Sequence, residues 1–146
     1  MGGRSKDGVL IIGIGSPFGE DTLGWEAVDT LPSIPGVNTL TLDRPGAGLI
    51  EAMKEQHTVI LVDAMDAGGP PGTVHVLSMD DLIHPDTTVS SHSLGVVGAL
   101  ALGKAMGVLP PTVHIIGIQM GSTPMPDEIR KSALAQIHQQ IRDWIE

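Results

Sequence analysis

Cysteine is absent from the 146-residue sequence, which excludes thiol catalysis, cysteine-type zinc sites and disulfide bonds. Basic residues are also few: 8 lysines and arginines stand against 17 aspartates and glutamates, for a formal net charge of −9. Because the chain has no basic run, we expect no nucleic-acid partner. No apolar run reaches the roughly 18 residues of a membrane span, and no apolar signal region follows the polar start MGGRSKDG. We therefore expect no membrane span and a cytoplasmic location.

Hydrophobic residues make up 41% of the chain and charged residues 17%, a balance typical of a folded globular protein. The length favours one domain over residues 1–146, since no repeat or linker divides the sequence. Short apolar runs that suit strands alternate with stretches of helical periodicity. The sequence predicts strands at 8–14, 37–43, 57–63, 73–78 and 111–119, and helices at 22–31, 46–55, 93–106 and 126–145.

This alternation predicts an α/β fold, a three-layer α/β/α sandwich around a mostly parallel five-stranded sheet with one antiparallel strand. The antiparallel strand is 73–78, because the turn cluster AGGPPG leaves no room for a helical crossover after 57–63. We expect this strand at an edge of the sheet. The segment 93–106 is apolar on nearly all sides, which predicts a buried helix whose three glycines allow close contact with the sheet.

The first predicted strand runs into the glycine-rich turn GIGSPFGEDTLG, a context that often indicates a phosphate-binding loop. A dinucleotide fingerprint needs glycine at the first, third and sixth positions; Gly13 and Gly15 fit, but Phe18 does not. Asp43, at the end of the second strand, would suit a ribose-binding acid. The acidic pair Glu20-Asp21 would, however, compete with a pyrophosphate at the start of the helix. The turn therefore indicates a use for carboxylates rather than for phosphate.

Open α/β sheets bind their ligands outside the carboxyl ends of the strands. Three polar residues of the sequence are predicted to lie in or next to loops at that edge. Asp21 follows the first strand, Asp63 closes the third, and His92 precedes the helix 93–106. Two carboxylates and one imidazole suit a divalent metal with positions left open for substrate. A structural role stays open for each: Asp21 as a helix cap, Asp63 as a turn cap, and His92 as a neighbour of capping serines. The other histidines are predicted to be surface or core groups rather than ligands: His57, His75, His84, His114 and His138.

Four motifs follow one another along the chain: Gly13-Ile14-Gly15-Ser16 with Glu20-Asp21-Thr22-Leu23-Gly24; Val62-Asp63-Ala64 with Pro71-Gly72-Thr73; Ser90-Ser91-His92-Ser93-Leu94-Gly95; and Gly117-Ile118-Gln119. Over nearly the whole chain, their order, spacing and content resemble the nickel–iron hydrogenase maturation endopeptidases. That family removes a C-terminal extension from the hydrogenase large subunit.

The resemblance implies a metal-dependent, aspartyl-type peptidase in which Asp21, Asp63 and His92 are both the catalytic and the metal-binding residues. Glu20 matches the first acid of the pair, which in the family is not the main ligand. The implied partner is a hydrogenase large-subunit precursor. The implied cofactor is nickel, supplied by that bound substrate, so that cleavage follows nickel insertion.

Some positions depart from the family pattern. Ser16 stands where asparagine is usual, Arg44-Pro45 replaces two glycines after Asp43, and Met120 replaces a common proline. The loop 120–126 is also a few residues short. These segments line the presumed cleft, so the departures affect substrate identity more than the three metal-site residues.

Two other classes of function remain as alternatives. One is a non-catalytic, chaperone-like member of the same fold that binds the tail; loss of the three site residues would have indicated it, and all three are present. The other is an unrelated α/β hydrolase with Ser90 or Ser91 as the nucleophile, but no G-x-S-x-G elbow occurs. The absence of H-E-x-x-H excludes a thermolysin-like zinc protease.

Overall fold

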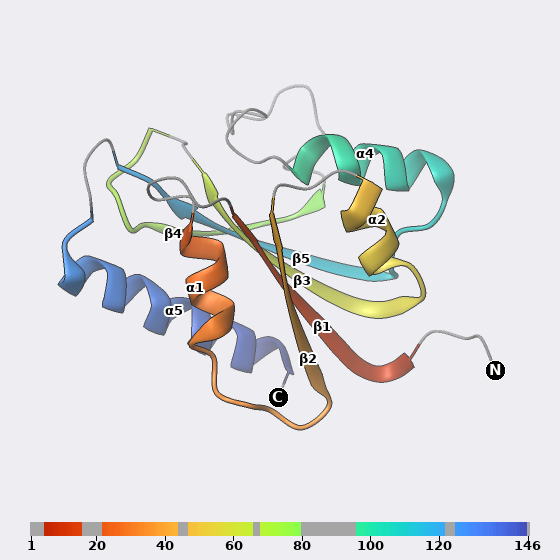
Figure 1. The fold of residues 1–146 in the computed structure, drawn as a ribbon, viewed down its shortest axis with the longest axis horizontal. Helices are drawn as coiled ribbons and strands as arrows, with labels where there is room; N and C mark the ends of the chain where they lie inside the picture. The colour runs from red at the N-terminus through yellow and green to blue at the C-terminus, as the bar shows by residue number, and fades with distance from the viewer. Residues whose placement is uncertain are drawn as a thin grey trace.

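The computed structural model describes residues 5–15, 22–43, 47–65, 68–79, 96–121 and 125–145 of the chain (Figure 1). The strands in these ranges are β1 (Ser5–Gly15), β2 (Val37–Asp43), β3 (Gln56–Met65), β4 (Val74–Leu77) and β5 (Thr112–Gln119). The helices are α1 (Leu23–Asp29), α2 (Ala47–Met53), α4 (Val96–Met106) and α5 (Asp127–Ile145).

The strands form one sheet in the order β2-β1-β3-β5-β4. β1 pairs in parallel with β2 and β3, β3 pairs in parallel with β5, and β4 pairs antiparallel with β5 at the edge. This arrangement confirms the predicted fold class and the predicted place of the antiparallel strand. The strand order reverses at β1, so the topological switch point lies between β1 and β3, where open α/β sheets bind their ligands.

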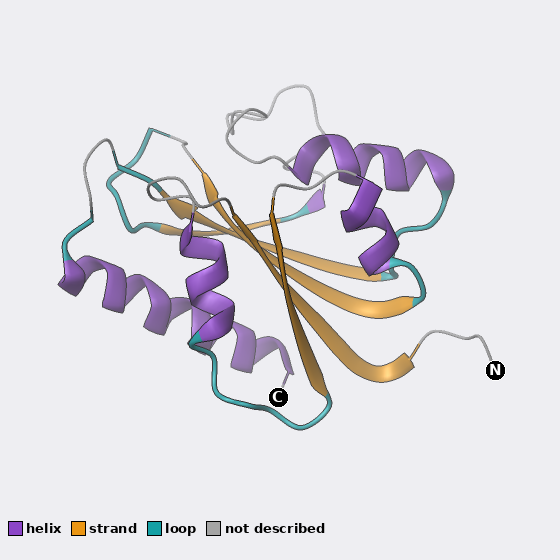
Figure 2. Ribbon diagram, in the orientation of Figure 1, coloured by secondary structure: helices purple, strands orange, loops and turns teal. Residues whose placement is uncertain are grey.

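Helices cover both faces of the sheet, α1 and α5 on one and α2 and α4 on the other (Figure 2). Buried residues of the central strands alternate between the two faces. Leu61 of β3 joins the cluster under α2 and α4, whereas Ile60 and Val62 join the cluster under α1 and α5. A strand covered on both faces buries every side chain, which is why these segments are continuous apolar runs.

The interpretation of 93–106 as a buried helix is wrong for α4, the part that the structure describes. Leu102 is 51% exposed, and open space surrounds the position that a Cβ on Gly98 would take. A Cβ on Gly103 would lie 2.7 Å from Cδ2 of Leu109, so this glycine packs on a loop rather than on the sheet. A helix in the outer layer of the sandwich buries only the face that packs on the sheet. In α4, apolar residues also occupy the face that is exposed to solvent. None of the helices within the described ranges has the length and apolar character needed to cross a membrane.

β3 continues past Asp63, which the sequence analysis placed at its end. Ala64 pairs with Ile118, and Met65 pairs with Gln119. Hydrogen bonding to β5 thus extends the strand by two residues beyond the prediction. Asp63 accordingly lies within β3 rather than in the following turn. Its side chain projects from the same face of the sheet as Leu61 and Met65, the face under α2 and α4.

Candidate functional site

The carboxyl edge of the sheet carries the buried polar side chains of the described core. Asp63 on β3 is 7% exposed and Gln119 on β5 is 2% exposed, whereas their buried neighbours are apolar. Asp63 pairs with Gly117, two residues before Gln119, so both polar side chains project toward the face under α2 and α4. Burying polar groups costs free energy unless they are well bonded. Gln119 offsets part of this cost, because its Nε2 donates to the carbonyl oxygen of Met120 at 2.9 Å. The switch-point edge is thus the polar part of the described core and the candidate site.

Asp63 is the one predicted metal-site residue that the structure describes. Asp21 and His92 lie outside the described residues, and so do Glu20 and Ser16 of the same motifs. No group of three histidines, aspartates or glutamates that could hold a metal occurs within the described ranges alone. The three-residue metal site therefore stays a prediction.

α1 rests directly on the backbone of β1 and β3. A Cβ on Gly24 would collide with the carbonyl oxygen of Ile14 and would lie 2.6 Å from that of Val62. A Cβ on Gly13 would in turn collide with the carbonyl oxygen of Gly24. Both glycines therefore allow the backbone of α1 to approach the backbone of the strands closely. The first turn of α1 consequently touches the residue that precedes Asp63.

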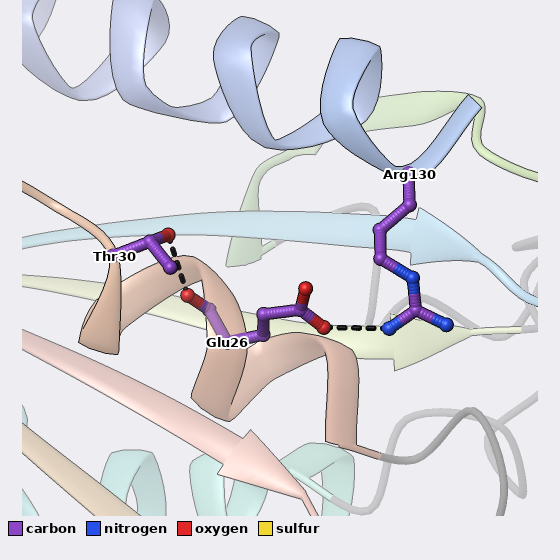
Figure 3. Close-up of polar contacts among 3 residues, drawn as sticks. All are labelled: Glu26, Thr30 and Arg130. Atoms are coloured by element: carbon purple, nitrogen blue, oxygen red, sulfur yellow. Dashed lines mark hydrogen bonds and ion pairs between the residues drawn. The ribbon is translucent and has the colours of Figure 1, made fainter. Parts of the chain in front are cut away.

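Polar contacts hold α1 in this position. Arg130 of α5 donates from Nη1 to Oε2 of Glu26 at 2.6 Å, and both side chains are partly buried (Figure 3). Toward β2, Trp25 donates from Nε1 to the carbonyl oxygen of Leu42 at 2.7 Å. The Thr30 hydroxyl donates to the carbonyl oxygen of Glu26 at 2.7 Å and closes the last turn (Figure 3). Contacts from two elements thus fix the helix that follows the acidic pair.

His138 of α5 bonds the C-terminal end of α1. Its Nε2 lies 2.9 Å from the carbonyl oxygen of Ala27 and 3.3 Å from Oγ1 of Thr30. Because a carbonyl oxygen can only accept, Nε2 is assigned as the donor in the bond to Ala27. The last carbonyl groups of a helix lack partners within it, and this bond satisfies one of them. His138 is thus a structural contact between α5 and α1.

The turn Pro70–Thr73 is fastened to the end of β5. Gly72 N donates to the carbonyl oxygen of Gln119, and Gln119 N donates to that of Thr73, both at 2.9 Å. Thr73 N donates to the carbonyl oxygen of Pro70 at 3.2 Å, and Gly72 has a φ of 86°, which requires glycine at the third position of a type II turn. These bonds hold the start of β4 at the carboxyl edge. Sequence analysis identified Gln119 as a motif residue, but its burial beside Asp63 appears only in the fold.

His114 of β5 stacks on Trp144 of α5, with ring centroids 4.1 Å apart and planes 11° apart. Burial lowers the pKa of His114 from the ordinary value of 6.5, because the charged ring would lose hydration. The residue lies three positions before Gly117, away from the carboxyl edge. Its role is therefore to pack α5 against the sheet.

The fold and the polar carboxyl edge of the sheet together define the class of this protein. It is an open α/β protein with a mostly parallel sheet and a buried carboxylate beside the topological switch point. Within that class, the chain belongs to the hydrogenase maturation protease family, whose model (HycI) matches residues 45–146.

Individual relatives agree with this family. The hydrogenase expression/formation protein HupD of Thiocapsa roseopersicina is 28% identical over 150 residues, which cover 98% of this chain and 66% of that protein. HupD of Rhodobacter capsulatus is 28% identical over 118 residues, which cover 76% of this chain and 56% of that protein. The chain thus spans less than two thirds of the length of these curated relatives.

Solved structures share the fold. The hydrogenase maturating endopeptidase HybD from E. coli superposes with a TM-score of 0.70 at 20% identity, over 93% of each chain. The [NiFe] hydrogenase maturation protease HycI from Thermococcus kodakarensis has a TM-score of 0.64 at 26% identity, over 95% of this chain and 92% of that one. The similarity extends over nearly all of this chain.

Proposed function

We propose that this protein is an endopeptidase that removes the C-terminal extension of a nickel–iron hydrogenase large-subunit precursor after nickel insertion. One observation carries the proposal: a chain of the hydrogenase maturation protease family places Asp63, a buried carboxylate, at the switch-point edge of its sheet. Buried polar groups persist where function offsets their cost in stability.

The proposed site consists of Asp21, Asp63 and His92, which serve both in catalysis and in sensing the metal. Asp21 is included in the proposed site because of the residues that follow it in the sequence, which the structure describes. Gly24, three residues after Asp21, packs on the carbonyl oxygen of Val62, the residue before Asp63. The contacts that hold α1 therefore act on the segment next to Asp21.

The inclusion of His92 rests on the position of α4. This helix begins at Val96, four residues after His92, and Val96 is fully buried. Val96 belongs to the same apolar cluster as Leu61 and Met65, which flank Asp63 on that face of β3. The start of α4 is thus packed on the face from which Asp63 projects.

The chemistry of the donors suits a divalent ion of borderline hardness such as nickel, since two carboxylates and one imidazole are available. In this proposal nickel is part of the precursor, where it would polarise the scissile carbonyl group or activate a water. In the proposed site, Asp21 and Asp63 would be neighbouring anions, and their repulsion would favour a cation between them. One of the two acts as the general base and accepts the proton of the attacking water on a carboxylate oxygen.

Co-incubation with a nickel-loaded large-subunit precursor, followed by mass spectrometry of the intact products, tests the proposal. We expect one cut, with product masses that sum to the precursor plus one water. A precursor that stays intact under conditions where the protein is folded would refute the proposed function.

A further inference from the structure

His75 on the edge strand β4 has an unusual environment. Within the described residues, its Nε2 is the one buried side-chain nitrogen or oxygen without a hydrogen-bond partner. Most buried polar side-chain atoms in folded proteins have a partner, because an unpaired one lowers stability. This nitrogen next to the candidate site is therefore available to bond a group that approaches it.

His75 lies in the same cross-strand row as Asp63. It pairs with Gly117 of β5, and Gly117 pairs with Asp63 of β3. Directly opposed residues project to the same face, so His75 and Asp63 flank Gly117 on one side of the sheet. With a strand spacing of about 4.8 Å, their Cα atoms are about 10 Å apart. Gly117 places no side chain between them.

The thioether of Met65 fills the space above Gly117. A Cβ on Gly117 would collide with Sδ of Met65 and would lie 3.6 Å from Cδ1 of Leu77. Both residues belong to the apolar cluster under α2 and α4. Apolar atoms therefore occupy the row between His75 and Asp63. Methionine is unbranched and adapts its conformation easily, so a bound peptide can rearrange this packing.

We propose that His75 is a positioning residue for Asp63, and that its Nε2–H donates a hydrogen bond to one carboxylate oxygen when the precursor tail is bound. The inference rests on the proposed function. As the tail occupies the carboxyl edge, the Met65 thioether withdraws and the two side chains meet above Gly117. Side chains of histidine and aspartate that lean toward each other span the distance of this row. One oxygen of Asp63 is then held by His75, and the other is directed at the substrate.

Three variants test this inference in the precursor-cleavage assay. His75→Leu removes the donor, His75→Gln keeps an N–H at similar reach, and His57→Gln is a matched control at the amino end of β3. We expect His75→Leu to lower kcat about 10- to 100-fold with KM unchanged, the loss typical when a group that orients a functional residue is removed. Its melting temperature should equal or exceed that of the unmodified protein, because an unpaired buried nitrogen is gone. His75→Gln should keep most of the activity, and His57→Gln all of it.

The outcomes separate this inference from the function on which it rests. If the unmodified protein leaves the nickel-loaded precursor intact, the proposed function is wrong and the role of His75 is wrong with it. If the precursor is cleaved and His75→Leu keeps a normal kcat, only the role of His75 is refuted. A raised KM at normal kcat, or a lowered melting temperature without rescue by His75→Gln, also refutes it, because these results mean tail binding or structural support instead.

Discussion

Asp63 is buried on a strand whose neighbouring residues, from Val59 to Met65, are otherwise apolar. An apolar residue of similar size would bury at this position with a smaller loss of hydration than a carboxylate. Gln119, at the end of the adjacent strand, is the other buried polar side chain of the described core. At the scale of residues, Asp63 is therefore a local departure from an apolar core, as its proposed role in the site would require.

Replacement of Asp63 by asparagine, which has nearly the same shape, separates chemistry from packing. Because the amide neither accepts a proton nor binds a cation as a carboxylate does, we expect Asp63→Asn to slow precursor cleavage by about 10²-fold or more while the fold is kept. Thermal melts and mass spectrometry of the products measure the two effects. Asp29→Asn, at an exposed position on α1, is the matched control. A cleavage-competent Asp63→Asn protein would exclude Asp63 from catalysis.

His114 makes stability depend on pH. Its pKa is lowered in the folded state, so the unfolded chain binds the proton more tightly. The contribution of the neutral ring to stability is therefore fully present above pH 6.5, the ordinary pKa, and is lost as the pH falls through the lower folded pKa. His114→Phe preserves a ring for stacking on Trp144 but does not titrate. Between pH 7.5 and pH 5.5, the melting temperature should fall less in His114→Phe than in the unmodified protein, and an equal fall would contradict this assignment.

Among the elements, α1 has the most demanding packing. Its first turn lies on the carbonyl oxygens of β1 and β3, and a side-chain contact with α5 and another with β2 hold it there. Partly exposed ion pairs such as that of Glu26 and Arg130 contribute little on their own. The close backbone contact at Gly24 therefore dominates the position of the helix.

Gly24→Ala tests this contact. The added methyl group would meet two backbone carbonyl oxygens, which cannot move without disturbing the sheet. We expect the free energy of unfolding to drop by about 3 kcal/mol, at the upper end of typical overpacking costs. Gly98→Ala on the exposed face of α4, where nothing lies within 4 Å, should instead gain about 1 kcal/mol of helix propensity. Urea unfolding of both variants measures the difference, and equal effects would show that α1 does not depend on the glycine.

At the scale of the whole molecule, proteolysis should depend on a finished substrate. The sequence lacks the H-E-x-x-H motif of metalloproteases that carry their own zinc, and the proposed mechanism places nickel in the precursor. We expect the isolated protein to leave unrelated peptides and nickel-free precursor uncut, while nickel-loaded precursor is processed. The measurement compares both precursors at equal protease concentration, with a chelator too weak to strip the loaded subunit. Equal cleavage of the nickel-free precursor would show a self-sufficient protease.

Most of the fold could be predicted from the sequence, because its signals are local. Continuous apolar runs predicted the central strands, and the short Pro-Gly turn predicted the antiparallel edge strand β4. The family motifs likewise pointed to the family that the chain belongs to. For α4 the local signal was misleading. Apolar composition alone cannot tell a helix buried on all sides from an outer-layer helix with apolar residues in solvent.

By itself, then, the sequence determined the fold class and the order of the strands along the chain, since periodicity, turn residues and motifs need no distant partner. It also predicted Asp63 as a site residue. Only the tertiary structure decided that α1 touches the residue before Asp63 and that His75 shares a row with it across Gly117. From the sequence, His75 was predicted to be a surface or core group. Its relation to Asp63 arises because β3 and β4, which follow each other in the chain, both pair with the distant strand β5. Strand register is set by packing of the whole sheet rather than by any local segment.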